Sequence, residues 1–224
     1  MAPPFLVDLF VFDIAGTTVR DDGMVHRAFR VVADRHRLSM SDEWIKARMG
    51  WNKVHVFAEA LRLSARDESG APALADEFTN AILADMDARP PEPLRGAAES
   101  MLGLTAAGVR TAFNTGYSAS LAEEIIRRVG WKPDAIIGSD LVPHGRPAPD
   151  MIRLAMSRTG VADPSRVGVA GDTPSDIAAG RAAGCRFVVG VTHGTFGAED
   201  LATAGATHVL PDLLGLMEVL RGSR

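Results

Sequence analysis

The chain contains almost no cysteine. Cys185 is the one cysteine in 224 residues, so neither an intramolecular disulfide nor a cysteine-based metal cluster can form. We expect Cys185 to be a small buried apolar residue. This composition suits a reducing environment, and we expect a cytoplasmic protein.

Two further absences exclude classes of partner. No apolar run approaches the length of a membrane span, and the apolar start of the chain carries Asp8 and has no basic residue before it, which is a poor signal peptide. The formal net charge is -4, with acidic and basic residues interspersed, so nothing favours nucleic acid or a membrane surface. We therefore expect a small-molecule partner.

Short apolar runs are plentiful in a chain that is 46% hydrophobic, and its length suits one globular domain or a domain with a large insertion. Runs rich in β-branched residues predict buried parallel strands at residues 5–12, 109–113, 135–137, 167–170, 187–191 and 208–210. Helical patterns lie between them. The clearest covers residues 120–129, where Ser120 and Glu123 suggest a capping box and Gly130 ends the helix. Strands that alternate with helices predict an α/β fold with a doubly wound parallel sheet.

One region breaks this alternation. Residues 18–89 contain no convincing strand, and their apolar residues recur at helical spacing in two sets: Val25, Ala28, Phe29 and Val32, then Leu74, Phe78 and Ile82. The region ends at the proline-rich stretch RPPEPLRG, which favours extended backbone and is typical of a linker. We predict a helical domain at 18–89, inserted into a core made of residues 1–17 and 90–224.

Four polar segments follow predicted strands: 13–18 (DIAGTT), 114–117 (NTGY), 145–147 (GRP) and 171–176 (GDTPSD). In an open parallel sheet, loops at the carboxyl ends of the strands converge on one crevice. Taken singly, an aspartate after a strand is more often a helix cap or a turn former than a nucleophile. Taken together, the four segments predict a site.

The predicted site combines aspartate carboxylates that suit a metal ion with polar groups that suit a phosphate. Asp13 and Asp172 can share Mg²⁺, and Asp176, one helical turn later, would face the same ion. The Thr115 hydroxyl, the backbone at Gly116 and the Arg146 guanidinium suit phosphoryl oxygens. Asp13 can then attack phosphorus and become an aspartyl-phosphate.

The order of these motifs resembles the haloacid dehalogenase superfamily of phosphohydrolases across essentially the whole chain. The motifs are Asp13-x-x-Gly-Thr, Thr115-Gly116, Arg146-Pro147 with Ala148-Pro149-Asp150, and Gly171-Asp172-x-x-x-Asp176. The resemblance implies a Rossmann-like core and an inserted α-helical cap domain that closes over the substrate. It also implies Mg²⁺ held by Asp13, the carbonyl of Ala15 and Asp172.

The residue at position 15 distinguishes between branches of this superfamily. Phosphatases of the superfamily usually carry a second aspartate there, which protonates the leaving alkoxide, and Ala15 cannot do so. The stretches DIAGTTV, NTGYS and GRPAP look like the phosphonatase branch, the phosphonoacetaldehyde hydrolases and their relatives. In that branch a lysine forms a Schiff base with the aldehyde and accepts the electrons of the carbon–phosphorus bond. Lys53, in MGWNK, stands where the family places this lysine, although a cap lysine is usually a solvated surface residue.

The resemblance also assigns substrate-binding positions: Ala15, Gly16, Thr17, Met49, Gly50, Gly116 and Tyr117. Core packing explains Met49 equally well, and Gly50 could simply end a helix. The family's cap histidine has no clean match, since His55 falls one position early. This departure puts part of the family's chemistry in doubt.

The leading interpretation is a Mg²⁺-dependent phosphonatase-type hydrolase with Asp13, Lys53, Thr115 and Arg146 as catalytic residues. Two alternatives stay open: a phosphatase of a small phosphomonoester, and a phosphate-ligand binding protein without catalysis. A homodimer through the first cap helix would use Val25, Phe29 and Val32, if these are exposed.

Overall fold

A six-stranded parallel sheet forms the centre of the protein. The computed structural model describes residues 5–221. The strands are β1 (Leu9–Phe12), β2 (Arg110–Thr115), β3 (Ala135–Gly138), β4 (Val167–Gly171), β5 (Phe187–Val191) and β6 (His208–Leu210). Their order is β3-β2-β1-β4-β5-β6, and every neighbouring pair is parallel. The predicted α/β class with a Rossmann-like parallel sheet is confirmed.

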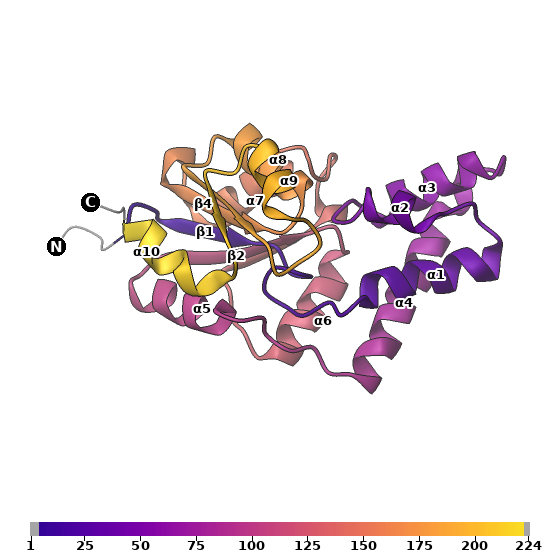
Figure 1. The fold of residues 1–224 in the computed structure, drawn as a ribbon, viewed down its shortest axis with the longest axis horizontal. Helices are drawn as coiled ribbons and strands as arrows, with labels where there is room; N and C mark the ends of the chain where they lie inside the picture. The colour runs from indigo at the N-terminus through magenta and orange to yellow at the C-terminus, as the bar shows by residue number, and fades with distance from the viewer. Residues whose placement is uncertain (1–4, 222–224) are drawn as a thin grey trace.

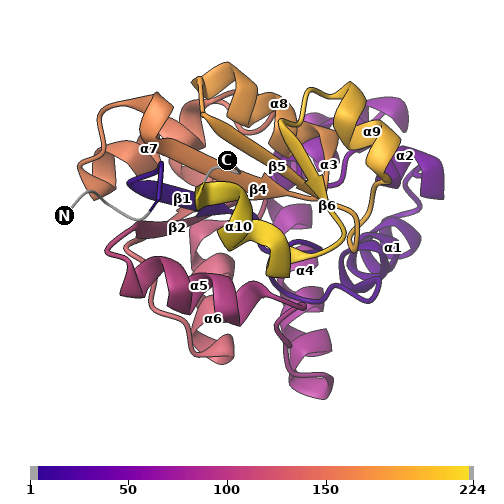
Figure 2. The ribbon, with the colours of Figure 1, turned by 60° about the vertical axis from the view of Figure 1, so that its left-hand side comes forward.

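Helices cover both faces of the sheet (Figures 1 and 2). The helices of the described residues are α1 (Met24–His36), α2 (Asp42–Lys46), α3 (Lys53–Leu63), α4 (Ala71–Ala88), α5 (Ala97–Ala106), α6 (Ala119–Val129), α7 (Asp150–Thr159), α8 (Pro174–Ala183), α9 (Ala198–Thr203) and α10 (Leu216–Arg221). Helices α5, α6 and α10 pack on one face, and α7, α8 and α9 pack on the other. Among the described residues, no helix combines the length and apolar character that a bilayer crossing requires.

Helices α1 to α4 form a separate lobe beyond the carboxyl ends of the strands (Figure 1). We call it the helical lobe. Its centre is aromatic: the ring centroids of Phe29 and Phe78 lie 4.7 Å apart, and those of Phe29 and Phe57 lie 5.6 Å apart. Its four helices lie between residues 24 and 88, and the division of the chain into a core and an inserted cap at 18–89 stays a prediction.

Three expectations need correction. The first strand begins at Leu9 rather than at residue 5, although Phe5 and Val7 are still buried. Helix α6 is capped by Ser118, whose hydroxyl accepts the backbone N–H of Leu121, and not by Ser120. An amphipathic pattern locates the buried face of a helix, but two serines two residues apart leave its first turn ambiguous.

The third correction concerns the expected dimer surface. Val25, Phe29 and Val32 are all buried inside the helical lobe, where they pack against its other helices. They therefore supply no surface to a second copy. Cys185 is buried as expected, and burial raises the pKa of its thiol to about 12.

Candidate active site

Three buried carboxylates meet at the carboxyl ends of β1 and β4. Asp13 follows β1, Asp172 follows β4, and Asp176 lies in the first turn of α8. One oxygen from each lies within 4.8 Å of the others. The structure therefore brings together the aspartates that the sequence proposed as metal residues.

The donor set fits a hard divalent cation. All three groups are buried carboxylates, the ligands that Mg²⁺ prefers. Burial, and then the charge of Asp13, raise the pKa of Asp172 to about 6, as expected for a buried carboxylate beside a second negative charge. Its carboxylate is oriented by the Thr17 hydroxyl, at 3.1 Å, and the Thr195 backbone N–H, at 2.7 Å.

Arg146 supplies the cationic side of the site. Its Nη1 donates to Asp13 Oδ1 at 2.8 Å and also contacts Asp176 Oδ1. The guanidinium is almost fully buried, and its Nε has no acceptor among the described residues. Thr115 is buried at the end of β2, and its hydroxyl accepts the backbone N–H of Tyr117 at 3.3 Å.

Lys53 is the first residue of α3, and its side chain is buried. Only 7% of the residue is exposed. Its Nζ donates a hydrogen bond to the carbonyl oxygen of Trp51 at 2.8 Å. Three rings surround it, those of Phe29, Phe78 and Tyr117, each with its centroid 5.5 Å from Nζ.

This environment changes the acid–base behaviour of the amine. Burial, and then the charge of Arg146, lower the pKa of Lys53 to about 7, against the opposing effect of Asp13 and Asp21. The amino-terminal end of a helix also disfavours a positive charge. A large fraction of Lys53 is therefore neutral, and nucleophilic, near neutral pH.

Lys53 and Asp13 line one cavity of about 30 Å³ between the helical lobe and the sheet. The other residues around it are Ala15, Asp21, Val25, Met49, Gly50, Thr115, Gly116, Tyr117, Arg146, Asp172, Thr173 and Thr195. We call it the inner cavity. Most of the substrate-binding positions expected from the sequence are in this set. Gly16 and Thr17 are not: Gly16 faces a neighbouring hollow, and Thr17 lies behind Asp172.

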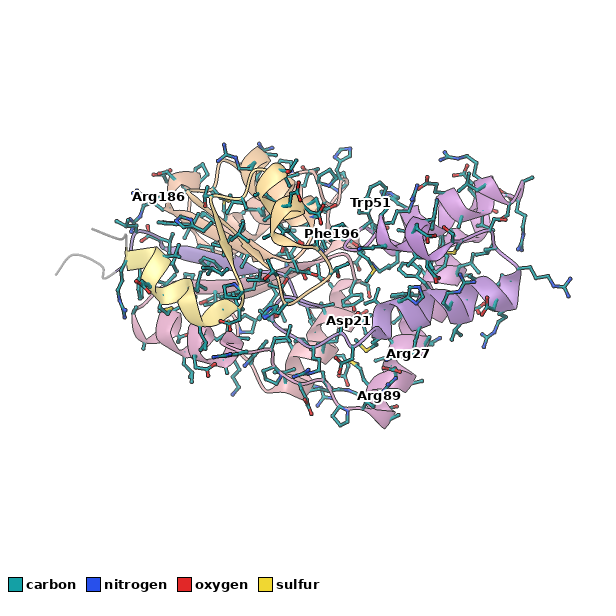
Figure 3. The ribbon with its side chains drawn as sticks, viewed as in Figure 1. Asp21, Arg27, Trp51, Arg89, Arg186 and Phe196 are labelled. Atoms are coloured by element: carbon teal, nitrogen blue, oxygen red, sulfur yellow. The ribbon has the colours of Figure 1, made fainter. Side chains whose placement is uncertain are left out.

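The segment before α3 fastens the helical lobe to the sheet. The Trp51 indole N–H donates to Ser175 Oγ at 3.1 Å, and the Asn52 amide donates to Ser139 Oγ at 3.0 Å. The backbone also approaches closely, because a methyl group added to Gly116 would overlap the carbonyl oxygens of Gly50 and Trp51. Figure 3 shows Trp51 on this side of the lobe and Asp21 on the segment that leads into α1.

Two features of the site had no signal in the sequence. Asp21 lines the inner cavity, although RDDG looks like an ordinary turn. A second cavity of about 490 Å³, the outer cavity, adjoins the inner one, and Asp21, Met49 and Thr195 line both. His26 and His193 line the outer cavity only, whereas His55 is exposed on α3.

Comparison with known proteins supports a hydrolase. The family model for haloacid dehalogenase-like hydrolases matches residues 7–184. A phosphonoacetaldehyde hydrolase of Bacillus cereus is 29% identical over 206 residues, covering 84% of this chain and 77% of that protein. The probable phosphatase IndB of Dickeya dadantii is 30% identical over 204 residues, covering 88% of this chain and 86% of that protein.

Solved structures share the fold. A phosphonoacetaldehyde hydrolase-like protein from Oleispira antarctica superimposes with a TM-score of 0.83 at 21% identity, over 97% of this chain and 95% of that one. A hydrolase from Pseudomonas syringae also superimposes with a TM-score of 0.83, at 22% identity, over 94% of this chain and 96% of that one.

Proposed function

Because this chain belongs to the haloacid dehalogenase-like hydrolase family, we propose that it is a Mg²⁺-dependent hydrolase of the phosphonatase type. Its substrate is phosphonoacetaldehyde or a close analogue, and the bond that it cleaves joins carbon to phosphorus. One observation carries the proposal: a buried lysine with its pKa lowered to about 7 shares a cavity with Asp13.

Lys53 and Ala15 support the same reaction. When a phosphomonoester is cleaved, the leaving group is an alkoxide, which needs a nearby acid to protonate its oxygen. Ala15 offers none. When the carbon–phosphorus bond of a phosphonate is cleaved, the leaving group is a carbanion, which needs a group that accepts its electron pair. A neutral lysine amine provides it by condensing with the aldehyde to an iminium.

The remaining residues take defined parts in the reaction. Asp13 attacks phosphorus, the carbon–phosphorus bond breaks, and its electron pair moves into the iminium to give an enamine. Arg146 and Thr115 hold the phosphoryl oxygens, and Arg146 offsets the repulsion between the Asp13 carboxylate and an anionic substrate. Ala15, Met49, Gly50, Gly116 and Tyr117 line the wall around the carbon portion.

Asp13, Asp172, Asp176 and the Ala15 carbonyl would hold Mg²⁺. The ion supplies charge neutralisation and polarisation of the phosphoryl group. The inner cavity, at about 30 Å³, has room for little more than a water molecule. Substrate entry therefore requires the helical lobe to move away from the sheet, as a cap does.

The test is phosphate release from phosphonoacetaldehyde with Mg²⁺, with borohydride trapping followed by peptide mass analysis. The chain has three lysines, Lys46, Lys53 and Lys132, so the trapped residue is identified directly. We expect turnover and an adduct on Lys53 in the wild type, and neither in Lys53→Arg. Lys132→Arg, at an exposed position, is the matched control and should behave as the wild type does.

A second candidate is a small phosphomonoester. The outer cavity favours it, because about 490 Å³ next to the inner cavity can hold a larger leaving group, and the similarity to the probable phosphatase IndB agrees with it. Ester turnover that survives Lys53→Ala would establish this candidate. Mg²⁺-dependent binding of phosphate without turnover of either substrate class would instead indicate a binding protein.

A further inference from the structure

The proposed reaction needs a proton carrier beside Lys53. When Lys53 is an ammonium, Schiff-base formation begins with the loss of a proton from nitrogen, then moves a proton from nitrogen to oxygen, and ends with the loss of water. Ala15 has no ionisable group. His55, which follows Lys53 in α3, is exposed and does not line the inner cavity.

Most ionisable groups of the inner cavity already have another role in the proposed reaction or cannot exchange a proton. Those among the described lining residues are Asp13, Asp21, Lys53, Tyr117, Arg146 and Asp172. Asp13 and Asp172 face the proposed metal, and the Arg146 guanidinium is a permanent cation. Burial, and then the charge of Asp21, raise the pKa of Tyr117 well above its usual value, so the phenol stays protonated. Asp21 is the carboxylate that remains.

Asp21 is held in place by the start of α1. Its Oδ1 accepts the backbone N–H of Val25 at 2.9 Å, and its carbonyl oxygen accepts that of Met24 at 2.7 Å. The backbone N–H of Gly23 also acts on this carboxylate and opposes the effect of burial on its pKa. Because Asp21 lines both cavities, its carboxylate connects the enclosed amine with the larger, more open space outside.

We propose that Asp21 is the proton-transfer group for Lys53, taking a proton from the lysine nitrogen and delivering it to the oxygen of the aldehyde. The proposal rests on the phosphonatase function proposed above. It assigns a catalytic role to a residue that the sequence motifs did not single out.

The protons balance in four transfers. The Asp21 carboxylate first accepts a proton from the Lys53 ammonium. The neutral amine adds to the carbonyl carbon, the π pair moves to oxygen, and that oxygen takes the proton from Asp21. Asp21 then removes a second proton from nitrogen. When the nitrogen lone pair forms the C=N bond and the C–O bond breaks, this proton leaves with the oxygen as water.

The electrostatics of the cavity support the exchange. Burial raises the pKa of Asp21, while burial and Arg146 lower that of Lys53 to about 7. The two values move toward each other, so transfer between Asp21 and Lys53 is less strongly uphill in either direction, as a group that both accepts and returns protons requires. Asp21 also acts on Lys53 directly, since its negative charge opposes the lowering of the lysine pKa.

The test compares Asp21→Asn with the wild type on phosphonoacetaldehyde, through kcat, KM, their pH profiles and the rate of borohydride trapping. Asparagine keeps an oxygen acceptor for the Val25 N–H, so the start of α1 is preserved. We expect kcat and the trapping rate to fall about 100-fold or more, KM to stay within about threefold, and the acid limb of the kcat profile to lose the inflection that Asp21 produces while keeping the one that Lys53 produces. Asp21→Glu, which retains a carboxyl group, should recover part of the rate and the lost inflection.

Asp22→Asn is the matched control. Asp22 is the next residue, is exposed, and lines the outer cavity but not the inner one, so its variant should keep the wild-type rate. An Asp21→Asn enzyme with wild-type kcat and an unchanged pH profile would overturn the proposal and leave the phosphonatase function standing. So would an Asp21→Glu enzyme as slow as Asp21→Asn, or an equal loss in Asp22→Asn. Absence of wild-type turnover would overturn both the function and this role.

Discussion

Lys53 Nζ lies 2.8 Å from the carbonyl oxygen of Trp51, two residues earlier in the chain. The contact turns the side chain back over the amino-terminal end of α3 and into the aromatic enclosure of Phe29, Phe78 and Tyr117. Buried charge is costly unless it is paired, and neither Trp51 nor the three rings carries a full negative charge. This arrangement has a measurable effect on stability.

We predict that Lys53→Met stabilises the protein at pH 6 to 7. The folded-state pKa of Lys53, about 7, lies below the ordinary value of 10.5. The unfolded chain therefore holds an extra proton between these values, and wild-type stability rises with pH across this window. At pH 7 and below, the buried ammonium costs up to about 5 kcal/mol. Urea unfolding from pH 6 to 10 should show a gain for Lys53→Met that shrinks as pH rises, whereas exposed Lys132→Met shows none. Equal pH slopes in wild type and Lys53→Met would refute the prediction.

Ala15→Asp should change the preferred chemistry. A carboxylate in the inner cavity stabilises the ammonium form of Lys53, so borohydride trapping at pH 7 should fall about 10-fold or more. The same carboxyl group supplies the acid that an alkoxide leaving group needs, so phosphomonoester turnover should rise. Ala15→Ser, which adds no charge, should retain trapping. Unchanged trapping in Ala15→Asp would show that position 15 does not act on the lysine.

Gly116→Ala should separate the helical lobe from the sheet. The new methyl group would overlap the carbonyl oxygens of Gly50 and Trp51, and these backbone atoms can move only if the segment before α3 moves with them. We expect KM to rise and kcat to fall, each at least several-fold, with a loss of stability of about 1–3 kcal/mol. Gly70→Ala is the control, because a methyl group there makes an ordinary contact of 3.7 Å with Leu61. Wild-type kinetics in Gly116→Ala would contradict the close approach of the lobe.

Mg²⁺ should stabilise the protein through the three aspartates. A ligand that binds only the folded state adds about 2.7 kcal/mol at 100 times its Kd, so thermal unfolding with Mg²⁺ should shift upward by several degrees. Removal by EDTA should reverse the shift and stop phosphate release. Asp172→Asn should abolish the shift, whereas Asp163→Asn, at an exposed position, should preserve it. A full Mg²⁺ shift in Asp172→Asn would place the ion elsewhere.

The sequence predicted those parts of the site that local chemistry determines. Strands end where polar residues begin, so Asp13, Thr115 and Asp172 were found from the apolar runs before them. Asp21 was not found, because a turn sequence does not reveal that one of its side chains faces a cavity built by distant segments. The apolar stripe of α1 indicated a buried face correctly, but whether another helix or a second chain covers Val25, Phe29 and Val32 depends on tertiary packing.

Two parts of the protein enclose Lys53: Phe29 and Phe78 belong to the helical lobe, and Tyr117 and Arg146 belong to loops that follow β2 and β3. The dry surroundings of the amine exist only while the two parts are in contact. If the lobe opens as proposed, water would reach Nζ and its pKa would rise toward 10.5, so much less of the amine would be neutral at pH 7. Aldehydes that diffuse past the open protein would therefore meet a much less reactive group, and only a molecule held long enough for closure would meet a strong nucleophile. The protein would thus select first by how long a compound stays bound, and only after closure by the shape of that compound.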